Sequence, residues 1–113
     1  MTDLISELGV RMAHLDQALK TLRQNGIALA EAEREYKECV SKEALRLKGE
    51  GMAVTLIDKV IYGLPDVSIL RFKRDTARVV YEANQEAINI TKLQIRIIEN
   101  QLSREWNNTE RGI

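Results

Sequence analysis

Residues that commonly perform catalysis or bind metals are few in this sequence and stand far apart. The 113 residues include one histidine, His14, and one cysteine, Cys39. A zinc site needs several histidine or cysteine ligands, and a catalytic cysteine needs a neighbour that lowers its thiol pKa. No second imidazole or paired cysteine lies near His14 in the sequence, and no histidine lies near Cys39. We therefore interpret His14 as a helix-surface residue and Cys39 as a packing residue.

Two pairs of glutamates have the four-residue spacing that places both carboxylates on one face of a helix. These pairs are Glu31 with Glu35 and Glu82 with Glu86. Metal sites in helical bundles combine such carboxylates with Glu-x-x-His motifs, which the sequence lacks. It also lacks a phosphate-binding glycine loop, a Ser-His-Asp set and a Cys-x-x-Cys pair. We expect no catalytic, metal or cofactor site, and hence a protein that is not an enzyme.

One local concentration of positive charge, the basic strip, is formed by Arg71, Lys73, Arg74 and Arg78. Guanidinium groups along one side of a helix suit contact with phosphates, so nucleic-acid binding is an alternative function. The chain as a whole is not basic, because 17 lysines and arginines balance 17 aspartates and glutamates. We favour the simpler interpretation, in which the basic strip pairs with the acidic run of residues 31–43 on a neighbouring helix.

Two long amphipathic helices are predicted to carry these side chains. With 4% aromatic and 30% charged residues, the composition favours long helices over a sheet. In the first arm, about residues 3–48, mostly apolar residues recur at alternating spacings of four and three. This stripe consists of Leu8, Met12, Leu15, Leu19, Leu22, Gly26, Leu29, Glu33, Tyr36, Val40, Glu43 and Leu47. The spacing continues through Asn25 and Gly26, so we expect one uninterrupted helix.

Between the arms lies a corner, residues 49–65, which contains the one proline and three of the six glycines. Glycine commonly ends helices and proline begins them, so the chain is expected to reverse direction here. A short helix or ordered loop within the corner carries apolar residues on one side, namely Val54, Leu56, Ile57, Val60 and Ile61. Their pattern fits two roles, closing the end of the long helices or docking a partner protein.

The second arm is predicted over about residues 66–106. Its stripe, which we call the inner stripe, consists of Leu70, Arg74, Ala77, Tyr81, Asn84, Ile88, Thr91, Ile95, Ile98, Leu102 and Glu105. A second apolar set lies beside it: Ile69, Val79, Val80, Ala83, Ala87, Ile90, Leu93 and Ile97. A helix that is apolar over so much of its circumference needs more than one neighbour.

These features together predict an all-α fold, a long antiparallel helical hairpin with a short helix or ordered loop at the corner. The hairpin is expected to form a homo-oligomer, by default a dimeric four-helix bundle and alternatively a higher oligomer. Asn84, a polar residue within the inner stripe, is the candidate for fixing the number of subunits.

A corner centred near Ile57 also predicts which residues of the two arms face each other. On that basis Gly26 lies opposite Ile88, and Glu33 lies opposite Tyr81. Gly26 would then leave room for the larger side chain, and a Gly26→Leu substitution would strongly destabilise the hairpin.

The length of the chain is that of a single domain, in which residues 107–113 are predicted to be a frayed tail. One cysteine cannot form an intramolecular disulfide, which suits a reducing compartment. No stretch approaches the ~18 apolar residues of a membrane-spanning helix. We therefore expect a cytoplasmic protein that does not bind membranes.

Four segments of the chain share a pattern with a known group of proteins. They are Val54-Thr-Leu-Ile-Asp-Lys, Leu70-Arg-Phe-Lys-Arg-Asp-Thr-Ala, Tyr81-Glu-Ala and the stretch from Ala87 to Trp106. Over roughly residues 50–106 the chain resembles small coiled-coil proteins encoded by phages and prophages of Gram-positive bacteria. The resemblance implies a phage context, often near genes for recombination and single-stranded DNA binding, and transfers no functional residues.

The expected function is that of a non-enzymatic oligomeric coiled coil acting through protein–protein contacts in the host cell cytoplasm. Its partner would be a phage or host protein, for which it serves as an adaptor or as an accessory to phage DNA metabolism. Nucleic-acid binding through the basic strip is the first alternative, and a role in virion assembly is the second.

Overall fold

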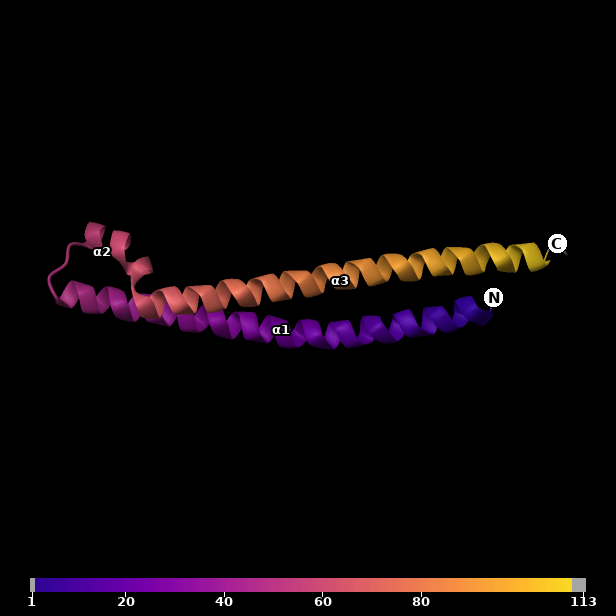
Figure 1. Ribbon diagram of the computed structural model, residues 1–113, viewed down its shortest axis with the longest axis horizontal. Helices are drawn as coiled ribbons and strands as arrows, with labels where there is room; N and C mark the ends of the chain where they lie inside the picture. Colours follow the sequence, from indigo (N-terminus) through magenta and orange to yellow (C-terminus); the bar gives the residue numbers. More distant parts are fainter. Residues whose placement is uncertain (1, 111–113) are drawn as a thin grey trace. The chain divides into compact units, whose positions relative to one another are not determined.

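The computed structural model describes residues 2–110, which form four helical elements in the order α1, α2, η1 and α3 (Figure 1). Two are long, α1 (Thr2–Gly49) and α3 (Pro65–Glu110). The corner contains α2 (Val54–Val60) and a 3₁₀ turn, η1 (Ile61–Gly63). The predicted all-α antiparallel helical hairpin with a short corner helix is confirmed. So is the uninterrupted first helix, because α1 continues through Asn25 and Gly26.

The chain divides into two compact units, which we describe in turn. The corner unit is Gln24–Tyr81 and contains α2 and η1. The terminal unit combines the first part of α1 with the last part of α3, residues 2–23 and 82–110 of the described chain. That the chain forms a single domain stays a prediction.

In the terminal unit, α3 presents the inner stripe to α1. Ile88, Ile95 and Ile98 are buried, and the half-buried Asn84 donates a hydrogen bond from its amide nitrogen to the backbone carbonyl of Ala18, at 3.3 Å. The small side chain at Ala18 allows this approach to the backbone. Asn84 therefore makes a polar contact within its own hairpin.

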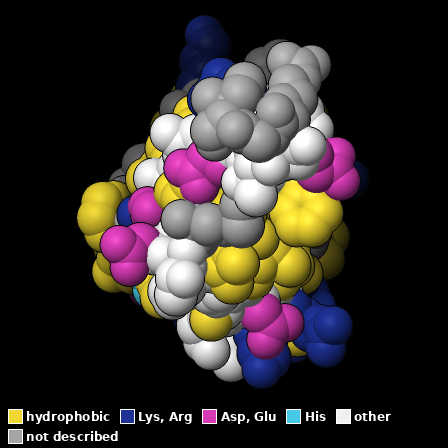
Figure 2. Space-filling view, turned by 90° about the vertical axis from the view of Figure 1, so that its right-hand side faces the viewer, with side chains coloured by type: hydrophobic (Ala, Val, Ile, Leu, Met, Phe, Trp, Pro, Cys, Tyr) yellow, Lys and Arg dark blue, Asp and Glu magenta, His cyan; other side chains and the backbone are white. Residues whose placement is uncertain are grey.

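In the terminal unit, alternate members of the stripe predicted for the first arm are displaced by one residue, while Leu8, Leu15 and Leu22 are partly buried as predicted. Met12 and Leu19 are about half exposed, whereas the preceding residues Arg11 and Ala18 are partly buried. The close contact at Ala18 explains the displacement, because a leucine at that position would hold the helices apart. Apolar side chains consequently reach the surface among acidic and basic ones, as the view onto the end with the termini illustrates (Figure 2).

The prediction of a frayed tail is wrong for residues 107–110. Helix α3 continues beyond Trp106 to Glu110, and the Thr109 hydroxyl donates a hydrogen bond to the Glu105 carbonyl at 3.0 Å. No glycine or proline interrupts residues 107–110, so nothing ends the helix there. The remaining predicted tail, residues 111–113, lies outside the described residues.

In the corner unit, Gly51 ends the first helix. It has a φ of +88°, the left-handed conformation that glycine adopts without strain. The backbone N–H of Gly51 donates to the Lys48 carbonyl at 3.0 Å, and the N–H of Met52 donates to the Leu47 carbonyl at 3.1 Å. These two bonds form a Schellman motif, and Met52 also packs on the apolar cluster that contains Leu47.

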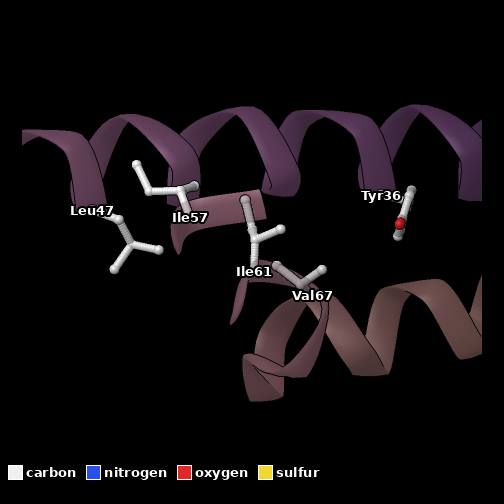
Figure 3. Close-up of a cluster of buried hydrophobic side chains, with 5 residues drawn as sticks. All are labelled: Tyr36, Leu47, Ile57, Ile61 and Val67. Atoms are coloured by element: carbon white, nitrogen blue, oxygen red, sulfur yellow. The ribbon is translucent and has the colours of Figure 1, made fainter. Parts of the chain in front are cut away.

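The reversal allows the corner to fold back on the end of α1. Five side chains from four segments form the buried cluster: Tyr36, Leu47, Ile57, Ile61 and Val67 (Figure 3). Ile57 on α2 and Ile61 on η1 are 5% and 3% exposed, and Val67 on α3 is fully buried. Leu64 is extended, as residues before proline usually are, and Pro65 then occupies the first turn of α3.

The predicted facing of the two arms is wrong by about two helical turns near Gly26. Gly26 lies against the ring of Tyr81, not Ile88, and Glu33 meets Arg78, not Tyr81. The reason is that the corner is asymmetric. The start of α3 lies beside Glu43 and Arg46 rather than beside the end of α1, because α2 covers the last turns of α1.

The left-handed turn predicts different outcomes for two neighbouring glycines. Gly51→Ala should lower the free energy of unfolding by about 1–2 kcal/mol, because a Cβ strains a positive φ although nothing lies within 4 Å of it. Gly49→Ala is the matched control, since Gly49 is helical and equally open, and it should be neutral or stabilising. Urea denaturation followed by circular dichroism measures both, and equal effects would contradict the assigned role of Gly51.

The contact between Gly26 and Tyr81 predicts a dependence on side-chain size. A Cβ at Gly26 would lie 3.4 Å from the nearest ring atom of Tyr81, an ordinary van der Waals distance. Gly26→Ala should therefore stabilise the helix by up to about 1 kcal/mol. Gly26→Leu should destabilise it by about 1–3 kcal/mol, because the ring must move. The same denaturation experiment tests both, and a Leu variant as stable as the Ala variant would contradict this contact.

Candidate interaction surfaces

The residues with reactive or metal-binding side chains are dispersed over the surface. His14 is exposed on α1. Within residues 2–110, no group of three or more histidine, cysteine, aspartate or glutamate side chains is arranged to hold a metal ion. Glu35 forms an ion pair with Lys73, and Glu82 and Glu86 line an open groove of the terminal unit.

Cys39 is half-buried in the corner unit, where it lines an open groove between α1 and the start of α3. Burial raises the pKa of its thiol, and the nearby carboxylates of Glu43 and Asp66 raise that pKa further, against a smaller opposing effect of Lys42. A raised pKa keeps the sulfur protonated at neutral pH, which is the opposite of what a nucleophile requires.

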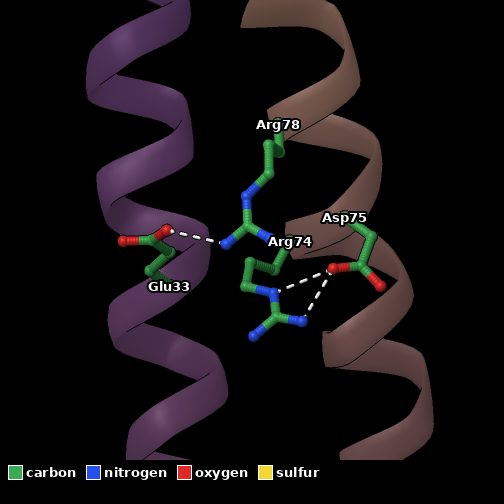
Figure 4. Close-up of polar contacts among 4 residues, drawn as sticks. All are labelled: Glu33, Arg74, Asp75 and Arg78. Atoms are coloured by element: carbon green, nitrogen blue, oxygen red, sulfur yellow. Dashed lines mark hydrogen bonds and ion pairs between the residues drawn. The ribbon is translucent and has the colours of Figure 1, made fainter. Parts of the chain in front are cut away.

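The basic strip is largely engaged with other side chains of the corner unit. The Lys73 ammonium lies 2.9 Å from a Glu35 carboxylate oxygen, and the Arg78 guanidinium lies 3.3 Å from Glu33 on α1 (Figure 4). The predicted pairing with the acidic run is therefore confirmed for Lys73 and Arg78. Each partner is about 40–60% exposed, so such a pair stabilises the hairpin by less than about 1 kcal/mol.

The other two cations contact aromatic rings. Arg74 binds Asp75 through two hydrogen bonds of 3.0 and 2.7 Å and lies 4.5 Å from the centre of the Tyr36 ring (Figure 4). The hydrogen bond from Arg74 lowers the pKa of Asp75. Arg71 stacks over Tyr62 at 5.3 Å. Phosphate binding would have to replace these contacts, so nucleic-acid binding gains no support from the arrangement of the basic strip.

The five corner residues divide between the two predicted roles. Ile57 and Ile61 are buried in the apolar cluster, and Val60 packs against it. Val54 is 60% exposed and Leu56 is 46% exposed. Closure of the corner therefore accounts for three of the five residues, while Val54 and Leu56 remain as candidates for docking a partner.

A second line of side chains on α3, the outer stripe, is exposed to solvent. It begins at Ile69 and repeats at alternating spacings of three and four. Its members are Ile69, Phe72, Thr76 and Val79 in the corner unit, and Ala83, Glu86, Ile90, Leu93 and Ile97 in the terminal unit. Every member is exposed, and Phe72 is 75% exposed. By contrast, the inner stripe is buried or half-buried at every position except Glu105.

The outer stripe shares six members with the second apolar set predicted from the sequence, and Phe72 is a large apolar member that this set omitted. Phe72 lies three residues after Ile69 and seven before Val79, so the heptad spacing itself was the missing signal. At 3.5 residues per turn, the two stripes lie roughly 150° apart around the helix. α1 covers the inner stripe, and no element of the described chain covers the outer one.

The environment of Cys39 predicts a slow thiol. At pH 7–8 its reaction with a disulfide reagent should be several-fold slower than that of the urea-unfolded chain, because the raised pKa lowers the thiolate fraction. The rate should climb as the pH rises toward the raised pKa. Stopped-flow absorbance measures the reaction rate of the thiol in folded and unfolded samples. Equal rates in the two samples would contradict this prediction.

Within residues 2–110, no helix combines the length and the apolar character needed to cross a bilayer. In comparisons with known proteins, the chain matches no family model, no curated protein and no solved structure.

Proposed function

We propose that this protein is a non-enzymatic helical adaptor that self-associates through the outer stripe of α3. The observation that carries the proposal is the exposure of a complete heptad line of side chains on a helix whose opposite side already packs on α1. Heptad spacing suits packing against another helix, because each apolar side chain can enter a gap between four side chains of the facing helix.

The amount of exposed apolar surface supports a second copy of the chain as the neighbour. The outer stripe has six large apolar members: Ile69, Phe72, Val79, Ile90, Leu93 and Ile97. Each is about half to three-quarters exposed, which amounts to on the order of 600 Å² for the stripe, the upper end of the largest patches on monomers. A standard interface buries about 800 Å² on each partner, so the stripe and its flanks are sufficient for a dimer.

The corner supplies the adaptor surface. Val54, Leu56 and Tyr62 are about half exposed there, and they are not part of the outer stripe. In the phage setting that the sequence resemblance suggests, the proposed partner is a phage or host protein, and the proposed task is an accessory one in phage DNA metabolism. A dimer would present two such corners to its partner.

Self-association predicts that a charge in the outer stripe separates the subunits. Phe72→Glu should convert the dimer to a monomer at micromolar concentration, because a carboxylate would be buried in the apolar contact. Light scattering coupled to size-exclusion chromatography measures the mass, and circular dichroism checks that the helices persist.

Leu45→Glu is the matched control. Leu45 on α1 is 72% exposed, close to the exposure of Phe72, but it lies outside the outer stripe. Its substitution should leave the dimer intact. The proposal is wrong if the unaltered protein is monomeric up to about 100 μM, or if both variants have the same effect.

A further inference from the structure

Two polar residues interrupt the outer stripe, Thr76 and Glu86. Within residues 2–110, the carboxylate of Glu86 has no hydrogen-bond or ion-pair partner, and neither has the hydroxyl of Thr76. The hydroxyls of Thr21, Thr91 and Thr109, by comparison, each donate to the carbonyl four residues earlier. A helix that covers the outer stripe must therefore supply hydrogen-bond partners for both side chains, because burying an unsatisfied polar group is costly.

We propose that two copies pair α3 against α3 in antiparallel orientation, with Thr76 of each copy facing Glu86 of the other. This inference rests on the proposed self-association and assigns its geometry. The Thr76 hydroxyl would donate a hydrogen bond to the Glu86 carboxylate across the contact, twice in a two-fold symmetric dimer. The corner-unit part of the stripe on one copy would pack on the terminal-unit part of the other.

Apart from the level of Thr76 and Glu86, this register places an apolar residue opposite an apolar residue at each level where two outer-stripe residues meet. In antiparallel coiled coils each position faces a position of the other type on the partner helix. The levels are Ile69 with Leu93, Phe72 with Ile90, and Val79 with Ala83, each formed twice. The largest side chains thus meet toward the ends, and the small Ala83 lies close to the two-fold axis.

Shifting one α3 helix by one heptad along the other removes this pairing of apolar with apolar residues. A shift in one direction places Ala83 against Glu86 and Thr76 against Leu93. The shift in the other direction places Ile69 against Glu86. Each arrangement buries the carboxylate against an apolar side chain, which disfavours it by several kcal/mol if the charge is retained.

A parallel, in-register pair is disfavoured by repulsion. Two-fold symmetry would then bring Glu86 against Glu86 of the other copy within an apolar contact. Like charges placed together in this way cost several kcal/mol or force one carboxyl to bind a proton. The antiparallel pair has a milder defect, because two Glu82 side chains approach at its solvent edge, where repulsion is screened. On the other edge Val80 meets Val80, which adds apolar contact.

A charge exchange tests the proposed facing. Thr76→Glu should weaken the dimer at least about tenfold, because it opposes Glu86 of the other copy. Adding Glu86→Lys should restore the dissociation constant to within a few-fold of the original. Within one chain the two positions are ten residues, or about 15 Å, apart along the helix, so the rescue must act between copies. Adding Glu99→Lys instead changes the charge equally and should not rescue.

Cysteine cross-linking gives an independent readout. In a Cys39→Ala background, the double variant Ile69→Cys, Leu93→Cys should form a covalent dimer on mild oxidation. The single variant Phe72→Cys should not, because antiparallel pairing separates the two copies of residue 72. Covalent dimers of the Phe72→Cys variant, or failure of Glu86→Lys to rescue while the unaltered protein is dimeric, would overturn the antiparallel pairing and leave self-association standing. A monomeric unaltered protein would overturn both proposals.

Discussion

The structure depends on one geometric constraint, that a helix with apolar stripes on two sides needs two neighbours. α1 supplies the first neighbour of α3, and the inner stripe is buried or half-buried accordingly. Nothing in residues 2–110 supplies the second, so the outer stripe is exposed, and in the proposed dimer a second copy would cover it. A single hairpin cannot resolve this, because the two stripes point in nearly opposite directions.

In the proposed dimer, polar residues at both stripes would have a similar effect, which is to select one arrangement among several of similar apolar content. On the inner side, Asn84 donates to the carbonyl of Ala18, a bond that a shift along the helix would break. On the outer side, Thr76 and Glu86 would act in the same way in the proposed dimer. Buried polar residues in coiled coils often select register at some cost in stability.

The charges of the corner unit add little stability but restrict what the surface can bind. Lys73 and Arg78 reach across to Glu35 and Glu33, while Arg71 and Arg74 lie over aromatic rings. A basic strip arranged in this way presents less free positive charge than its sequence indicates. The apolar surface of α3 is therefore the stronger basis for recognition.

The sequence by itself determined the helices and their faces. Heptad spacing identified the inner stripe of α3 and apolar composition indicated a second side, while glycine and proline located the corner, because these signals depend on residues close together in the chain. The tertiary structure alone decided which residues meet. A heptad pattern is unchanged by a shift of seven residues, so it could not reveal that Gly26 faces Tyr81 rather than Ile88. Nor could it show that Ile57 and Ile61 are buried while Val54 and Leu56 are exposed, because that division depends on how the corner folds back on the end of α1.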